Sequence, residues 1–255
     1  MNKKPENRIR LWAVAFWLLA WQGASMALAA AYPHGELLLC SPLSALLRLG
    51  EMAATASFWQ TVGRSCLRIF GGFLASCLLA AVLAVVSARF RRVRELLAPV
   101  VAVIKAVPVV SFIILALVWL NARSLPLFIS GLMVFPPVYL NVLTGIGAAD
   151  RQLLEMARVF RVPLGRRLRA IYLPAVLPYF RAASSVALGL CWKSGAAAEV
   201  IGLSAGTIGE RLYTAKVYFQ TPDLFAWTAV IVAVSALFER LFLRLVDRAA
   251  ERMGV

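Results

Sequence analysis

The feature that most constrains the fold of this chain is a succession of apolar stretches, each about 20 residues long. A helix of that length crosses roughly 30 Å, which is the thickness of the hydrocarbon core of a bilayer. Apolar residues make up 62% of the sequence, whereas soluble domains are usually about 45–50% apolar. The sequence therefore predicts an all-α integral membrane protein.

Six stretches are expected to form transmembrane helices, at about 11–32, 66–87, 96–120, 125–147, 176–200 and 224–245. The first has the basic start and small residues of a secretory signal peptide, but its length and its tryptophans favour a retained span. Residues 41–53 have helical apolar spacing, which predicts a short amphipathic helix on the outer surface. Pro99 and Pro108 lie inside the third span.

The net charge of +15 would suit a nucleic-acid binder, but the basic residues gather at the ends of the apolar stretches. The positive-inside rule places such residues in the cytosol. With both termini inside, the cytosolic side holds sixteen of them: Lys3, Lys4, Arg8, Arg10, Arg89, Arg91, Arg92, Arg94, Arg151, Arg158, Arg161, Arg166, Arg167, Arg169, Arg248 and Arg252. The outer loops are expected to hold Arg48, Arg123, Arg211 and Lys216. We therefore expect cytosolic segments at 1–10 and 249–255 and a single transmembrane domain over 11–248.

The cysteines and the histidine give no sign of a metal centre. The four cysteines are scattered and form no Cys-x-x-Cys pair of the kind that zinc sites use. The only histidine in the sequence, His34, is not close to any other candidate ligand pair. Free buried thiols are favoured over disulfides at Cys40, Cys66, Cys77 and Cys191. We expect no metal and no cofactor.

Residues 150–174 form the largest predicted cytosolic loop. Asp150 can cap a helix whose apolar face holds Leu153, Ala157 and Phe160. Pro163 is expected in the first turn of a second helix, which Pro174 ends. Two interpretations stay open at this point: a pair of helices lying on anionic lipid, or a docking element for a cytosolic partner.

Five residues of this loop stand at the spacing E-x-A-(13 residues)-I-x-L-P: Glu155, Ala157, Ile171, Leu173 and Pro174. The spacing resembles the EAA signature of the permease subunits of binding-protein-dependent ABC importers. Residues 10–248 resemble the nitrate, sulfonate and taurine branch of that family, in CSPLSALLRL, IKAVPVVSFIILALVWL, WKSGAAAEVIG and TPDLFAWTAVIV. Two positions depart from the family pattern: Met156 replaces a small residue, and Arg161 replaces the glycine that usually ends the first helix. Either Pro163 makes the bend instead, or the local geometry is shifted.

The resemblance implies that the loop is a pair of coupling helices that docks on a separate ATPase. The implied coupling residues are Glu155, Ala157, Arg158, Arg161, Pro163, Gly165, Ile171, Leu173 and Pro174. The chain has no G-x-x-x-x-G-K-[ST] motif, so ATP would be hydrolysed by the partner and not by this subunit. The implied partners are ABC ATPase subunits, a second permease copy and an extracytoplasmic substrate-binding protein, at the bacterial inner membrane.

Ionisable residues inside spans are costly and often functional, which makes Lys105, Lys193 and Glu199 candidates for the translocation path. Snorkelling or structural pairing is the alternative for each. Lys193 and Glu199 are six residues apart and therefore do not share a helical face. Pro108 and Phe112 are further path candidates, and the resemblance implies that an outer stretch with Glu210 and Arg211 meets the binding protein.

Two lysines near a path would suit a small anion such as a sulfonate, taurine or nitrate, although the same branch also serves thiamine-pyrimidine-type precursors. The alternative function is a self-contained secondary transporter or channel. Such transporters usually contain internal repeats, and we detect none in this sequence. A membrane enzyme is disfavoured because the chain has no HExxH motif and no paired carboxylates on one span.

Overall fold

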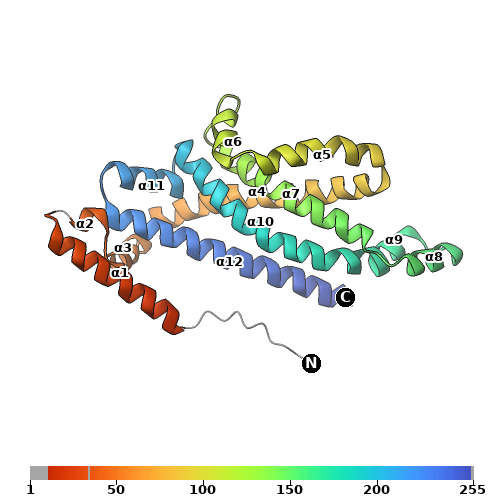
Figure 1. The fold of residues 1–255 in the computed structure, drawn as a ribbon, viewed down its shortest axis with the longest axis horizontal. Coiled ribbons are helices and arrows are strands. Elements are labelled where there is room, and N and C mark those ends of the chain that lie inside the picture. The colour runs from red at the N-terminus through yellow and green to blue at the C-terminus, as the bar shows by residue number, and fades with distance from the viewer. Residues whose placement is uncertain (1–10, 34, 254–255) are drawn as a thin grey trace. The chain divides into compact units, whose positions relative to one another are not determined.

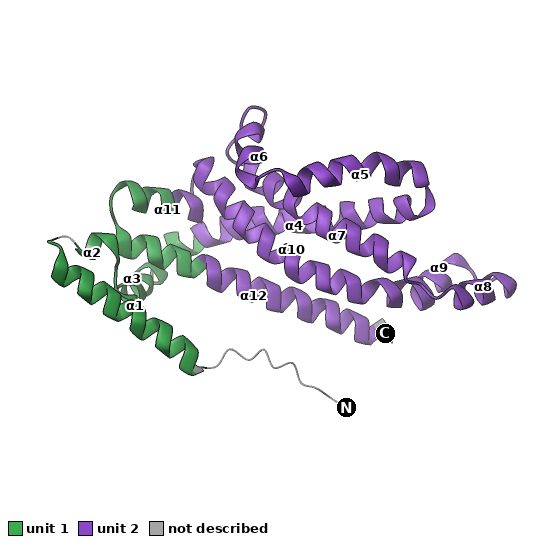
Figure 2. Ribbon diagram, viewed as in Figure 1, with its two compact units in different colours: residues 1–60, 211–230 green, residues 61–210, 231–255 purple. Residues whose placement is uncertain are grey.

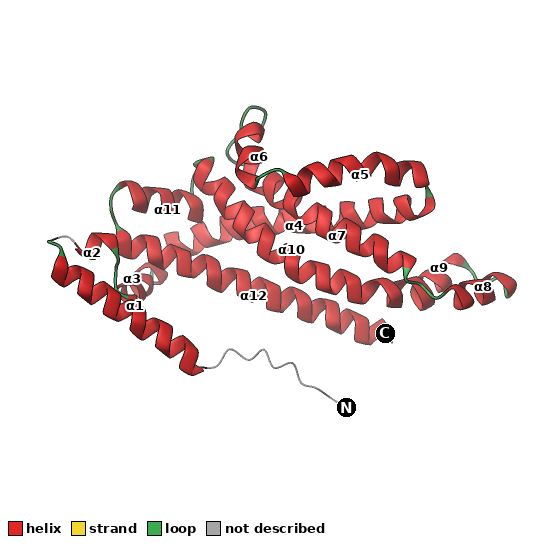
Figure 3. Ribbon diagram, in the orientation of Figure 1, coloured by secondary structure: helices red, strands yellow, loops and turns green. Residues whose placement is uncertain are grey.

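The computed structural model describes residues 11–33 and 35–253, which form helices joined by short turns, with no strand among them (Figure 3). The predicted all-α class is confirmed. The basic residues predicted at 3–10, His34 and the end of the predicted tail lie outside the described residues. The predictions made for them are not tested.

Four helices are long and apolar enough to cross a membrane, and a fifth span is possible if a bent pair of helices counts as one. They are α1 (Leu11–Ala31), α4 (Ala56–Arg89), α7 (Leu125–Gly147) and the segment that ends in α10 (Leu173–Ile201). The predicted sixth span lies inside α12 (Thr221–Met253). This helix is long enough to cross a membrane but is not among the four candidate spans. A crossing by α12 therefore stays a prediction.

The chain divides into two compact units, shown in different colours in Figure 2. Unit 1 comprises residues 1–60 and 211–230, and unit 2 comprises residues 61–210 and 231–255. The shorter helices of the described residues include α2 (Gly35–Leu38), α3 (Pro42–Ala53), α6 (Val109–Ala116) and α11 (Ile208–Val217). The prediction of one domain over 11–248 is untested by this division.

Unit 1 holds the predicted amphipathic helix, observed as α3. Ser41 caps it by accepting a hydrogen bond from the backbone N–H of Ser44 at 3.1 Å, and Pro42 occupies its first turn. Arg48 joins α3 to the start of α12 through two hydrogen bonds to Asp223, of 2.5 and 3.2 Å. This bidentate pair raises the pKa of Arg48.

Unit 2 is built around α4, α7 and α10, whose small residues allow close packing. At Gly72 a Cβ would collide with the Leu127 carbonyl and the Ser130 side chain, so only glycine fits there. Ser130 and Cys191 each donate a hydrogen bond to the carbonyl of Ile69, at 3.3 and 3.4 Å. These contacts bring the three helices together. The core around them includes Ile69, Phe73, Val134, Leu188 and Trp192.

The predicted third span is broken, which corrects the expectation of one helix over 96–120. It consists of α5 (Arg91–Ala106) and α6 (Val109–Ala116), which are bent by 105°. Val107 and Pro108 are both extended, with ψ of 132° and 138°. A residue before proline avoids the helical region, and proline donates no hydrogen bond, so the helix stops here. Pro99, by contrast, is accommodated within α5.

Proline does not break α7, which spans the predicted range of 125–147. Pro136 and Pro137 both lie inside this helix. The side-chain amide of Asn141 donates to the Pro137 carbonyl at 2.8 Å and adds a local bond in the turn that follows the prolines. The helix therefore breaks at Pro108 but continues through this proline pair.

Candidate coupling site

The first helix of the predicted coupling loop is α8 (Arg151–Val159). Asp150 caps it, as predicted: its carboxylate accepts a hydrogen bond from the backbone N–H of Gln152 at 2.8 Å. Within the predicted apolar face only Ala157 is buried, at 2% exposure. Leu153 and Phe160 are exposed.

The bend after α8 shows how the helix ends with Arg161 in the place of the usual glycine. Arg161 takes the left-handed conformation with φ of 49°. The N–H of Arg161 donates to the Arg158 carbonyl at 3.1 Å, and the N–H of Val162 donates to the Ala157 carbonyl at 2.9 Å. These two bonds form a Schellman motif, with Arg161 at the position that favours glycine. Arg161 therefore makes the turn itself, and of the two alternatives left open by the sequence, the one in which Pro163 turns the chain is wrong.

Arg167 adds a second contact to the same bend. Its guanidinium donates to the Val162 carbonyl at 3.3 Å, which ties the second helix back to the turn. Pro163 is extended and precedes that helix, α9 (Leu164–Arg167), as its N-cap residue. Because proline has no N–H to leave unsatisfied, it suits this position.

The second coupling helix does not end at Pro174, contrary to expectation. A π-helical turn, η1 (Leu168–Tyr172), joins α9 to α10 without a break, and Pro174 lies in the first turn of α10. Within this turn the N–H of Leu173 donates to the carbonyl of Leu168, five residues earlier. The wider turn accommodates a proline whose ring would clash with the carbonyl four residues before it.

The surface of α8 and α9 is apolar between arginines. Val159, Phe160 and Leu164 are 77%, 75% and 72% exposed. Glu155, Gly165 and most of the arginines are exposed as well: Arg151, Arg158, Arg161, Arg166 and Arg169. Ile171, Leu173 and Pro174 are half-buried, where the segment runs into α10. Figure 1 shows α8 and α9 at one end of unit 2.

The structure does not bring the predicted path residues together. Lys105 is exposed in the last turn of α5, where a cation is favoured by the helix dipole. Lys193 is exposed and Glu199 is fully buried, so they occupy different faces of α10, as their spacing predicts. Phe112 packs against the buried clusters as a core aromatic residue.

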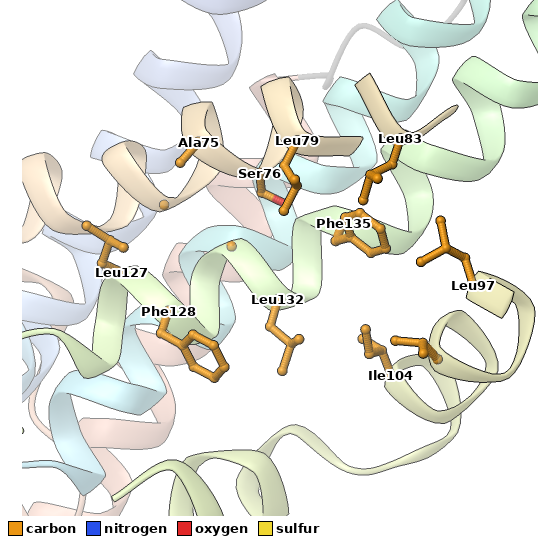
Figure 4. Close-up of a pocket in the computed structure, with 13 residues that line it drawn as sticks. Ala75, Ser76, Leu79, Leu83, Leu97, Ile104, Leu127, Phe128, Leu132 and Phe135 are labelled. Atoms are coloured by element: carbon orange, nitrogen blue, oxygen red, sulfur yellow. The ribbon is translucent and has the colours of Figure 1, made fainter. Parts of the chain in front are cut away.

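A pocket of about 420 Å³ lies between α4, α5 and α7, and its lining is apolar apart from Ser76 (Figure 4). Leu79, Leu132 and Phe135 point into it. None of the predicted path residues lines it. Its chemistry suits an apolar group and offers a small anion no counter-charge.

The buried carboxylate of Glu199 organises the opposite end of unit 2. One of its oxygens accepts hydrogen bonds from Ser65 Oγ at 2.8 Å and from the backbone N–H of Gly209 at 3.1 Å. Ser65 Oγ in turn accepts from the N–H of Ile208 at 2.9 Å. The second carboxylate oxygen is buried and has no partner among the described residues. Glu199 thus fixes the start of α11 against α4 and α10.

Sequence reasoning missed the arginines near this carboxylate. Arg68 lies inside the predicted span 66–87, and the rule that selected Lys105 would have selected it as well. Arg64 precedes the same span and adds a fifth basic residue to the predicted outer side. The orientation favoured by the charges is unchanged.

The comparison with known families decides the class of this chain. Residues 76–254 match the model of the binding-protein-dependent transport system inner membrane component. The chain belongs to this family. It is therefore a permease subunit of an importer and a multi-pass inner-membrane protein, and the family resemblance stated from the sequence is confirmed.

Individual relatives cover most of this permease. One from Brucella melitensis, named as an ABC transporter permease, is 26% identical over 84% of this chain and 87% of its own length. The riboflavin transport system permease of Chloroflexus aurantiacus is 27% identical over 89% and 86%. A permease named for aliphatic sulfonates in Escherichia coli is 30% identical over 81% of each chain.

Proposed function

We propose that this permease forms the translocation path of an ATP-driven importer and that residues 150–174 couple it to a separate ATPase. One observation carries the coupling proposal: α8, α9 and the bend between them expose large apolar side chains among arginines. Exposed apolar surface of this kind marks a contact site for a protein or a membrane. The Schellman turn and the Arg167 contact hold the two helices in one arrangement, which suits docking into a shaped cleft.

The role of the individual coupling residues follows from their positions. Glu155 is exposed on α8 and can meet a basic group of the partner. The exposed arginines on both helices can meet acidic groups. Ala157 has a different role, because its buried side chain and its carbonyl belong to the turn itself.

Three further elements complete the proposal. A second copy of the permease would complete the path, and an extracytoplasmic binding protein would deliver the substrate. Glu210 and Arg211 stay candidates for that contact, although the Glu210 carboxylate already accepts a hydrogen bond from the Gly206 N–H at 2.5 Å. The substrate class we propose is a small organic or inorganic anion, for which the sulfonate relative is the supporting case.

Glu155→Lys tests the coupling proposal. The change places a positive charge on a surface already rich in arginine, so we expect at least a tenfold loss of ATPase subunit co-purifying with the tagged permease, together with loss of uptake. Membrane insertion should stay normal, because Glu155 is exposed. The measurement is quantitative co-purification from membranes expressing both subunits.

Glu251→Lys is the matched control, since it reverses an exposed glutamate near the end of α12. It should retain both the ATPase and uptake. If Glu155→Lys retained a normal amount of co-purifying ATPase, the docking proposal would be wrong. Uptake by the permease alone in liposomes would instead favour a self-contained transporter.

A further inference from the structure

We propose that the end of unit 2 opposite α8 holds an oxyanion-binding site formed by the guanidinium groups of Arg64, Arg68 and Arg123. This site is distinct from the coupling helices. It also differs from the lysines considered as path residues. Its ligand class is a small anion or headgroup with several equivalent oxygens, such as a sulfonate, sulfate, phosphate or carbonate group.

Three separate segments bring these arginines together. Arg64 and Arg68 are one helical turn apart on α4 and therefore share a side of it. Arg123 lies in the turn between α6 and α7. The Ser204 hydroxyl donates to the Ala122 carbonyl beside Arg123, and the Arg64 guanidinium lies against Gly206. Residues 204–206 thus lie between the two groups of arginines.

The charges of this cluster are not balanced. The positive charges of Arg64 and Arg123 repel the Arg68 guanidinium, and the negative charge of Glu199 attracts it. Among residues 11–33 and 35–253, none of the three arginines takes part in an ion pair, since the pairs formed there involve Arg48, Arg91 and Arg181. Glu210 is a second nearby carboxylate, since it binds the N–H of Gly206, against which Arg64 lies. Three guanidinium groups therefore face two carboxylates.

The hydrogen-bonding groups are also incompletely used. One terminal nitrogen of Arg68, Nη1, is buried and donates to no acceptor within the described part of the chain. Glu199 does not supply that acceptor in this structure: one of its oxygens is bonded to Ser65 and Gly209, and the other has no hydrogen-bond partner among the described residues. A buried charged donor without an acceptor is costly. Guanidinium groups match oxyanions in geometry, so an oxyanion would satisfy both the donor and the charge.

The position of the site gives it a place in transport if the proposed function holds. Residues 202–210 follow α10 at the end of unit 2 opposite the coupling helices (Figure 1). In the predicted orientation that is the outer end, where an anion released by a binding protein would first meet the permease. The binding test below requires neither an ATPase nor transport. Its outcome is therefore separate from that of the coupling proposal.

Sulfate is the probe for the first arm of the test. The full chain is placed in nanodiscs of neutral phosphatidylcholine, and thermal unfolding is followed while sulfate replaces chloride at constant ionic strength. We expect sulfate to stabilise the wild type and to bind Arg68→Gln at least about tenfold more weakly, since hydrogen bonds to charged groups are lost. Arg92→Gln, an exposed arginine of α5, should respond like the wild type.

Phosphatidylglycerol distinguishes a lipid headgroup from a free anion. Native mass spectrometry after extraction from phosphatidylglycerol-containing bilayers should show a retained lipid, lost in Arg68→Gln, if the natural ligand is a headgroup. A sulfate response without a retained lipid identifies a free anion. Either pattern supports the site.

Two results would overturn the proposal: equal sulfate responses in Arg68→Gln and Arg92→Gln, or neither a sulfate response nor a retained lipid in the wild type. Arg64→Gln and Arg123→Gln are the alternative variants, and both are expected to fold because these side chains are exposed. If Arg68→Gln does not fold, these two variants must show the same weakening of sulfate binding, and wild-type binding in both would reject the site.

Discussion

At the scale of single residues, Arg161 illustrates how a helix can end without glycine. Its left-handed conformation carries a cost of roughly 1–2 kcal/mol for a residue with a side chain. The hydrogen bonds of the Schellman motif and the Arg167 contact hold it in place. The spacing of the EAA signature located this bend, but the conformation was not predictable, because it depends on bonds made by residues on both sides of the turn.

Arg161→Gly should stabilise the coupling loop. Glycine adopts positive φ without steric cost, so we expect up to about 1–2 kcal/mol of local stabilisation. Hydrogen exchange of residues 158–163 in the purified full chain would measure it as slower exchange. Arg158→Gly is the matched control: it lies inside α8, where glycine costs about 1 kcal/mol, and should accelerate exchange. Faster exchange in both variants would contradict this account of the turn.

At the scale of helices, sequence patterns gave reliable positions where caps and apolar stretches agreed. The bounds predicted for α7 match the structure, with Asn121 and Pro126 marking its start. The proline rules were less reliable. Pro108 divides a predicted span whereas Pro174 interrupts nothing, because the π-helical turn before it removes the steric conflict. Such adjustments depend on packing that one sequence does not reveal.

Asp150→Ala should loosen the start of α8. Loss of the side-chain cap on Gln152 costs about 1 kcal/mol, which corresponds to roughly fivefold faster hydrogen exchange in the first turn of the helix. Asp150→Asn keeps an acceptor oxygen and should exchange nearly as the wild type does. Unchanged exchange in Asp150→Ala would mean that the cap contributes nothing.

At the scale of the whole molecule, the sequence predicted the class of the protein better than its number of crossings. Family membership and helical content follow from long apolar stretches and one spaced motif. The number of spans is harder to predict, because a broken helix such as α5–α6 and a long partly charged helix such as α12 both have ambiguous lengths. The arginine cluster at the far end of unit 2 was hidden for another reason: it joins residues more than fifty positions apart.

Fusions at the two termini would test the predicted topology. Six crossings place both termini in the cytosol, as the basic residues favour, whereas five place them on opposite sides. Fluorescent-protein fusions should therefore be fluorescent at both ends, and alkaline phosphatase should be inactive at both. An alkaline phosphatase insertion at 121–124 should be active and serves as the positive control. An active phosphatase at the C-terminus would show that α12 does not cross.

The unbroken helical segment Leu164–Ile201 has a mechanical consequence. Its 38 residues correspond to about 57 Å of helix, with the exposed apolar residues of α9 at one tip and Glu199 near the other. A rod pivoting about its packed middle swings its two tips in opposite directions. If α8 and α9 couple to an ATPase as proposed, a force applied to them is delivered, without an intervening joint, to the carboxylate that anchors residues 204–210 and to the arginines around them.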